Sequence, residues 1–189
     1  PEQPAHQFLR AFGSEWGRPA AILVISAHWE TSGPTLTTAP RLETIYDFGG
    51  FDPALYAMRY APPGAVAVSE RAHALLESAG FAPHVNTRRG IDHGAWVPLA
   101  LMYPEADVPV VQLSVQPHLG AAHHQALGQA LRLLREEGVL ILASGSLTHN
   151  LREAFRWTPG AATPTQVSAR RRAGQPPGPG QGSLGGAFI

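Results

Sequence analysis

Hydrophobic residues along the chain fall into patterns that predict several strands. Residues 20–26 (AAILVIS) and 139–143 (VLILA) are short apolar runs that contain β-branched side chains. Runs of this kind are typical of strands buried on both faces of a parallel sheet. Residues 107–116 alternate apolar and polar positions after Pro109, and this alternation predicts a further strand.

Apolar positions at helical spacing separate these strands. They predict helices over residues 4–16, 66–79 and 121–137, and shorter helices from Pro53 and over 97–103. We also expect a brief strand over residues 81–85 and an edge strand within 31–40. Because strands alternate with helices, the fold class should be α/β: a single domain with a mostly parallel central sheet and helices on both faces.

The aromatic-rich segment of residues 45–60, IYDFGGFDPALYAMRY, allows two interpretations. It is either a packed cover over the sheet or a lid that lines an aromatic substrate pocket. A packed cover is the more ordinary use of such a segment, and it is the interpretation we favour.

The sequence changes character after about Arg156. Residues 158–189 hold 5 prolines and 7 glycines, carry no acidic residue and show no hydrophobic periodicity. Such a segment offers too little apolar surface to offset the entropy lost on ordering. We therefore predict a folded region over residues 1–157. The tail over residues 158–189 is then either disordered or an out-of-frame translation of a GC-rich gene.

Composition narrows the classes of partner and site. Lysine and arginine number 14, as do aspartate and glutamate, so we expect neither nucleic acid nor membrane as a partner. The absence of cysteine excludes disulfides and thiolate metal ligands. The N-terminal residues, PEQPAHQFLR, lack the features of a secretory signal peptide and also lack an initiator methionine. We expect a cytoplasmic protein whose given sequence begins within a longer chain.

Three histidines are candidates for a shared site. His28 and His149 follow the predicted strands over residues 20–26 and 139–143, and His93 lies in the loop GIDHGAWVP. The carboxyl ends of parallel strands share one edge of the sheet, which is where open α/β sheets bind ligands. Imidazole ligands without cysteine suit Fe(II) or Zn(II) with open coordination positions. Zinc hydrolysis and iron oxygenation both fit, as does a structural role for each histidine alone.

A second group of histidines, His118, His123 and His124, lies around the start of the helix predicted from residue 121. Adjacent residues on a helix point in different directions, so His123 and His124 are poorly placed to bind one ion. We do not expect these three to be ligands.

Four stretches of the chain together resemble a known family. They are ILVISAHWE, TIYDFGGFDPALYAMRYAPPG, GIDHGAWVPLALMYPEADVPVVQLSV and EEGVLILASGSLTHNLR, and they span Ala20 to Phe155. In these stretches the chain resembles the class III extradiol ring-cleavage dioxygenases, in particular the 4,5-DOPA dioxygenase-like branch. The resemblance implies an oxidoreductase with non-haem Fe(II), or Zn(II) in some members. Its substrates would be a catechol, such as DOPA, and dioxygen, and the ring would open beside the two hydroxyls.

The resemblance also implies roles for individual residues. His28 matches a metal ligand of the family. His149 matches a histidine described either as a ligand or as the catalytic acid/base, and His93 matches the catalytic histidine that faces substrate and oxygen. Asp92, next to His93, receives no role.

Two features of the family are missing from this sequence. The family's Gly-His-Gly-Ser-Pro ligand motif does not occur, and the Gly/Pro-rich tail stands where a further ligand histidine is expected. The chain therefore resembles a fragment, and we expect weak metal binding and impaired activity. The alternatives are a non-catalytic metal-binding or interaction protein of the same fold, and a zinc-dependent hydrolase.

Overall fold

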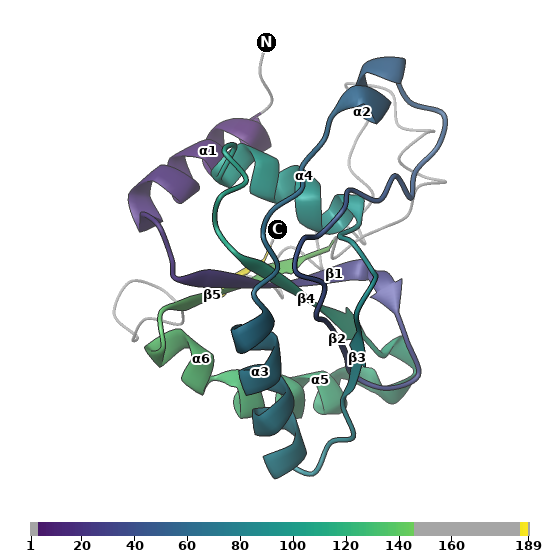
Figure 1. Ribbon diagram of the computed structural model, residues 1–189, viewed down its shortest axis with the longest axis vertical. Coiled ribbons are helices and arrows are strands. Elements are labelled where there is room, and N and C mark those ends of the chain that lie inside the picture. Colours follow the sequence, from purple (N-terminus) through teal and green to yellow (C-terminus); the bar gives the residue numbers. More distant parts are fainter. Residues whose placement is uncertain (1–3, 146–185, 189) are drawn as a thin grey trace, which may run out of the picture. The chain divides into compact units, whose positions relative to one another are not determined.

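The strands form one mixed sheet in the computed structural model, which describes residues 4–145 and 186–188 (Figure 1). They are β1 (Ala21–Glu30), β2 (Thr35–Thr37), β3 (His84–Asn86), β4 (Val110–Val115), β5 (Val139–Ser144) and β6 (Gly186–Phe188). Their order across the sheet is β3-β2-β4-β1-β5-β6. Neighbouring strands pair in parallel except β2 and β4, which are antiparallel. The predicted mostly parallel central sheet is thus confirmed.

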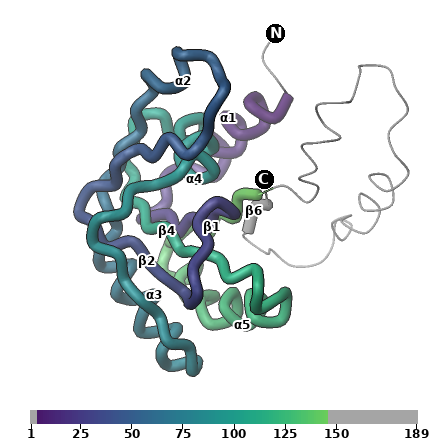
Figure 2. The backbone as a smooth tube through the Cα atoms, turned by 90° about the vertical axis from the view of Figure 1, so that its right-hand side faces the viewer, coloured from purple at the N-terminus to yellow at the C-terminus, as the bar shows by residue number. Residues whose placement is uncertain are grey.

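Helices cover both faces of this sheet, as predicted. They are α1 (Pro4–Trp16), α2 (Pro53–Ala57), α3 (Val66–Ser78), α4 (His93–Met102), the 3₁₀ helix η1 (Pro117–Leu119), α5 (Gly120–Leu131) and α6 (Leu133–Glu136). Figure 1 shows α1 and α4 on one face and α3, α5 and α6 on the other. The view in Figure 2, turned by 90°, shows α1 and α4 on one side of the strands and α3 and α5 on the other. None of the helices within residues 4–145 is long and apolar enough to cross a membrane.

The apolar run of β1 divides between two hydrophobic cores. Ile22 and Val24 pack with residues of α1 and α4, whereas Ala21 and Leu23 pack with residues of α3, α5 and α6. Successive side chains of a strand point to opposite faces, so a strand covered on both sides needs a continuous apolar run. This burial fixes β1 at the centre of the sheet, between β4 and β5.

Three details differ from the sequence-based expectation. β2 is an interior strand rather than an edge strand, because β3 pairs with it along its outer side. The polar positions of β4, Gln112 and Ser114, are fully buried, because hydrogen bonds inside the fold satisfy most of their polar atoms. The predicted helix over 121–137 is divided into α5 and α6 at Arg132, whose N–H bonds to the carbonyl of Gln129.

Three residues of the predicted tail form a strand. Gly186–Phe188 pairs in parallel with Ile141–Ala143 of β5, which extends the sheet by β6. For these residues the structure differs from the predicted disorder, since a free edge of β5 accepts their backbone groups. Residues 1–3, 146–185 and 189, which include His149, lie outside the described residues. The domain division at residue 157 therefore stays a prediction.

Candidate active site

His28 lies near the carboxyl end of β1, at the edge of the sheet where the sequence predicted a site. β1 continues to Glu30, four residues beyond the apolar run, and its pairing register with β4 shifts between Ile25 and Glu30. Irregularities of this kind re-aim side chains at sheet edges. The backbone N–H of His28 donates to Oγ of the buried Ser26 at 3.1 Å. The imidazole itself remains partly exposed, with 38% of the side chain accessible.

The sequence suggested that His93 lies in a loop. In the structure it is instead the first residue of α4. The carbonyl of Asp92 accepts from the N–H groups of Ala95 and Trp96 and so begins the helix. The Asp92 side chain makes no capping bond. Instead, Oδ1 of Asp47 accepts the N–H of His93 at 2.9 Å and satisfies a donor that the helix itself leaves free. The cap thus comes from a distant segment of the chain.

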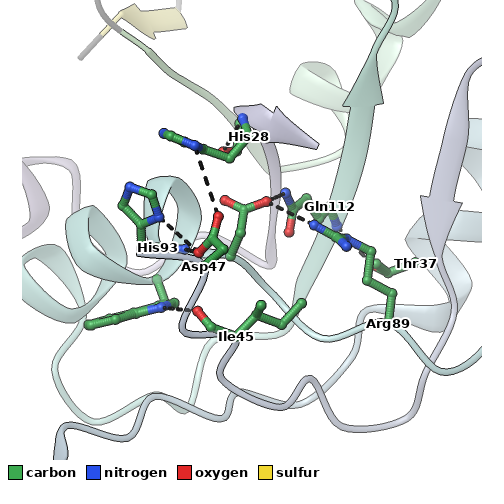
Figure 3. Close-up of polar contacts among 10 residues, drawn as sticks. His28, Thr37, Ile45, Asp47, Arg89, His93 and Gln112 are labelled. Atoms are coloured by element: carbon green, nitrogen blue, oxygen red, sulfur yellow. Dashed lines mark hydrogen bonds and ion pairs between the residues drawn. The ribbon is translucent and has the colours of Figure 1, made fainter. Parts of the chain in front are cut away.

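Asp47 links the two histidines (Figure 3). Its Oδ1 also bonds Nδ1 of His93 at 2.8 Å, and its Oδ2 lies 3.9 Å from Nδ1 of His28. The two imidazole rings have centroids 4.1 Å apart and planes inclined by 50°. Burial tends to raise the pKa of Asp47, but the bonds from His93 outweigh burial and the pKa is lowered overall. Asp47 is therefore a carboxylate at neutral pH.

Gly94 permits the close approach of α4 to β1. A Cβ at this position would lie 2.9 Å from Cδ2 of His28 and 3.3 Å from Oδ1 of Asp92, and would collide with Oγ of Ser26. Ser26 is fully buried and cannot move aside. Only glycine therefore allows the start of α4, and with it His93, to lie against His28.

A buried polar cluster lies beneath the two histidines. The fully buried Asp92 accepts at Oδ2 from Nε2 of Gln112 at 2.5 Å and from Nη2 of Arg89 at 3.3 Å. The Arg89 guanidinium also lies over the ring of Trp29, 4.6 Å from its centroid. Among the described residues, Oδ1 of Asp92 and Oε1 of Gln112 have no hydrogen-bond partner. The cluster thus places a buried carboxylate and its arginine partner close to the two histidines.

Aromatic side chains of the 45–60 segment pack beside His93. The rings of Phe48 and His93 meet edge to face, with their centroids 5.4 Å apart. Trp96 of α4 donates from Nε1 to the carbonyl of Ile45 at 3.0 Å. The outer members of the group stay accessible: Phe51 is 58% exposed and Tyr56 39%. The segment therefore packs against α4, whereas the sequence favoured a cover over the sheet, and it also presents aromatic surface next to the histidines.

His123 and His124 form a second pair, with a different environment. Nδ1 of His124 donates to the carbonyl of Gly120 at 2.8 Å, and its Nε2 accepts the N–H of Gln116 at 3.1 Å. Nε2 of His123 bonds Oε1 of Gln116 at 3.1 Å. The pKa of His123 is lowered by burial and by the neighbouring His124 and His118. These bonds hold the corner between η1 and α5.

The structure brings His28 and His93 together and adds a residue that the sequence analysis missed. His149 lies outside the described residues, so its position relative to them is not assigned. Asp47 was missed because it sits in an irregular stretch, before the Gly49-Gly50 break, with no periodicity to orient it. The available signal was a carboxylate within one of the stretches that carry the family resemblance.

A family match decides how this cluster is to be interpreted. Residues 3–163 match the family described as the catalytic LigB subunit of aromatic ring-opening dioxygenase. The chain belongs to this family. The resemblance to extradiol dioxygenases drawn from the sequence is thereby confirmed.

Individual relatives in this family agree. The chain is 53% identical over 151 residues to a 4,5-DOPA dioxygenase extradiol of Beta vulgaris, covering 78% of this chain and 56% of that protein. It is 45% identical over 142 residues to the 4,5-DOPA dioxygenase extradiol of Escherichia coli K12, covering 74% of this chain and 51% of that protein. The chain thus spans about half the length of these relatives.

The fold agrees with a solved structure as well. The crystal structure of an uncharacterized protein from Escherichia coli K12 superimposes with a TM-score of 0.73 at 34% sequence identity, covering 93% of this chain and 68% of that chain. The α/β architecture of this family member is therefore shared with an experimentally determined relative.

The donor atoms at the site fit a metal ion. His28, Asp47 and His93 each offer a ligand atom, and these atoms lie within 4.8 Å of one another. Two imidazoles and one carboxylate are donor types found in non-haem Fe(II) sites with open positions, so these residues could hold an ion if Asp47 and His93 both acted as ligands. A first-row metal is thus chemically compatible with this edge of the sheet, and the donor set does not choose between iron and zinc.

Proposed function

We propose that this chain carries the site of an extradiol dioxygenase that opens the ring of a catechol, such as DOPA, with dioxygen. The observation that supports the proposal best is the convergence of His28, Asp47 and His93 in a member of the ring-opening dioxygenase family. The names of the relatives indicate a DOPA-like catechol as the substrate class. The cofactor in this proposal is Fe(II) or Zn(II).

In this proposal, His28 is a metal ligand and His149 is either a second ligand or an acid/base. The partly exposed imidazole of His28 lies near the carboxyl end of β1 and is accessible to an ion. A bound metal would hold catecholate and dioxygen together so that electrons can pass from the ring to oxygen. Because the family's Gly-His-Gly-Ser-Pro motif is absent from these 189 residues, we expect the given chain to bind metal weakly and to turn over slowly.

His93 is the proposed catalytic acid/base beside the substrate. Its Nδ1 is engaged by Asp47, so Nε2 is the ring nitrogen left to accept a proton from a catechol hydroxyl. Imidazole suits this task because its ordinary pKa lies near neutral pH. The exposed aromatic surface of Phe51 and Tyr56 would flank a flat aromatic substrate near this nitrogen.

The proposal is tested by loading the chain with excess Fe(II) without oxygen and then adding DOPA and air. We expect a yellow ring-opened semialdehyde, slow product formation by the given chain, and none by His28→Ala or His93→Ala. His124→Ala, which alters the other histidine pair, should retain the activity. Metal binding without any product would contradict the dioxygenase proposal and would favour the non-catalytic metal-binding alternative.

A further inference from the structure

We infer that Asp47 is a positioning residue that fixes the tautomer and the ring orientation of His93. The inference deepens the proposed function and rests on it for the role of His93, but its structural content stands separately. The decisive observation is that one carboxylate oxygen, Oδ1, accepts both the backbone N–H and the ring Nδ1 of the same residue, at 2.9 and 2.8 Å.

The carboxylate determines which ring nitrogen carries hydrogen. An ionised carboxylate only accepts hydrogen bonds, so an imidazole nitrogen at 2.8 Å from it must be the donor. Nδ1 of His93 is therefore the protonated nitrogen, and Nε2 holds the lone pair. This is the form that a base needs if it is to accept a proton at Nε2.

The surrounding structure holds Asp47 in place independently of its bonds to His93. The N–H of Ile45 bonds the carbonyl of Ile91 at 2.9 Å, and the N–H of Ile91 bonds the carbonyl of Glu43 at 2.9 Å. The indole of Trp96 anchors the carbonyl of Ile45 from α4 (Figure 3). The segment before Asp47 is thus bonded to Ile91, which precedes α4, and to Trp96, which lies within α4. These bonds hold Asp47 in place, so that Asp47 imposes the orientation of His93.

A direct ligand role for Asp47 is the competing explanation. Oδ1 already faces two N–H donors, and a cation placed there would be repelled by the same hydrogens. Of the two carboxylate oxygens of Asp47, Oδ2 is the one without these N–H donors, and it lies 3.9 Å from Nδ1 of His28. A bound ion would therefore have to use Oδ2. A positioning role uses the contacts that exist, whereas a ligand role requires the carboxylate to give them up.

The test uses ¹⁵N-labelled histidine in the metal-free chain at about pH 8, above the ordinary imidazole pKa of about 6.5. The ring signals of His93 report which nitrogen carries hydrogen. We expect the Nδ1–H form in the unaltered protein and in Asp47→Asn, whose amide oxygen can still accept. Asp47→Leu, which removes the acceptor at similar volume, should shift His93 toward Nε2–H.

Two controls keep the result interpretable. Asp52→Asn alters another carboxylate of the same segment, one that accepts the N–H of Ala54, and should leave the His93 signals unchanged. The ring signals of His124, fixed by Gly120 and Gln116, should stay the same in every variant and would reveal a loss of fold.

Identical His93 signals in the unaltered protein and Asp47→Leu, with His124 unchanged, would overturn the inference. So would metal affinity that falls equally in Asp47→Asn and Asp47→Leu while the tautomer stays constant, because that result identifies a ligand. In turnover, a positioning role predicts a kcat reduced by about 10–100-fold in Asp47→Leu with little change in KM, and partial rescue in Asp47→Asn. The tautomer shift is measured without metal or catechol, so failure of the dioxygenase proposal alone would leave it intact.

Discussion

Among the described residues, two pairs of neighbouring histidines have different surroundings. His28 and His93 come from distant segments, yet their ring centroids lie 4.1 Å apart beside a carboxylate. His123 and His124 are adjacent in sequence and their centroids lie 5.2 Å apart, but their ring nitrogens bond the backbone and an amide. What separates a candidate site from a structural corner is therefore the partners of the ring nitrogens and not the spacing of the histidines.

The buried pair of Arg89 and Asp92, near His28 and His93, is the first place to sharpen this difference. Arg89→Met would leave the fully buried carboxylate of Asp92 with Gln112 as its only side-chain hydrogen-bond donor among the described residues, and it would remove the contact with Trp29. Breaking a buried pair in this way costs about 3–5 kcal/mol. We expect a loss of that order in the free energy of unfolding, measured by urea denaturation.

Arg71→Met is the matched control for this change. Arg71 bonds Glu137 through its Nε and Nη2 atoms on the surface, where solvent screens the pair, and we expect a far smaller loss. Equal losses in the two variants would show that the buried cluster has no special weight beneath the site.

Glycine positions near each pair give the next test. Gly94→Ala places a methyl group against His28, Asp92 and Ser26, and overpacking of this kind costs about 1–3 kcal/mol. It should also separate His93 from His28 and lower the rate of the proposed ring-opening reaction. Gly128→Ala in α5, where a Cβ meets nothing within 4 Å, should instead stabilise the chain by up to about 1 kcal/mol. Thermal melts and activity assays of both variants distinguish the two outcomes. An unchanged melting temperature and rate in Gly94→Ala would contradict the close packing of α4 against β1.

Substitution of a histidine from each pair should destabilise the chain by different amounts. His124→Ala removes the bonds to Gly120 and Gln116 and should lower the free energy of unfolding by about 1–2 kcal/mol. His28→Ala removes a partly exposed contact with Asp47 at 3.9 Å and the ring contact with His93, so its loss should stay below about 1 kcal/mol. Chemical denaturation of the two variants measures the contrast, and the reverse order would refute the structural role of the second pair.

The smallest expected effect concerns Tyr60, which ends the segment that carries Asp47. Its hydroxyl donates to the carbonyl of Tyr103 at 3.0 Å, so Tyr60→Phe should cost about 1 kcal/mol at pH 7. Burial, with the nearby Asp107 and Tyr103, raises the pKa of Tyr60 above its ordinary value. A raised pKa favours the neutral phenol in the fold, so its contribution is complete below about pH 10, the unfolded value, and is lost as pH rises further. Unfolding at pH 7 and above pH 10 should show the deficit of Tyr60→Phe shrinking; a constant deficit would contradict this.

Much of this architecture follows from the sequence. The apolar run of residues 20–26 identifies the central strand, because only a strand covered on both faces needs such a run. His28 and His93 could be placed near one sheet edge because strand direction and short connections leave few alternatives. The amphipathic helices α1 and α3 begin and end close to their predicted bounds for the same kind of reason.

The polar details could not be predicted, because they depend on contacts between distant segments. Gln112 and Ser114 look solvent-facing in an alternating strand, yet both are buried, with partners from Asp92 and Thr31. Asp47 acquires its place from the bonds that tie Ile45 to Ile91 and Trp96, none of which leaves a local pattern. The sequence therefore indicates where the site lies better than it indicates which side chains organise it.

The most direct test of the account is a calorimetric titration of Zn(II) into the metal-free chain and into His28→Ala and His124→Ala, under identical conditions. We expect equal affinities for the unaltered chain and His124→Ala, and a loss of at least about 10–100-fold for His28→Ala. An unchanged affinity in His28→Ala, or a comparable loss in His124→Ala, would contradict the claim that the site lies at the carboxyl end of β1.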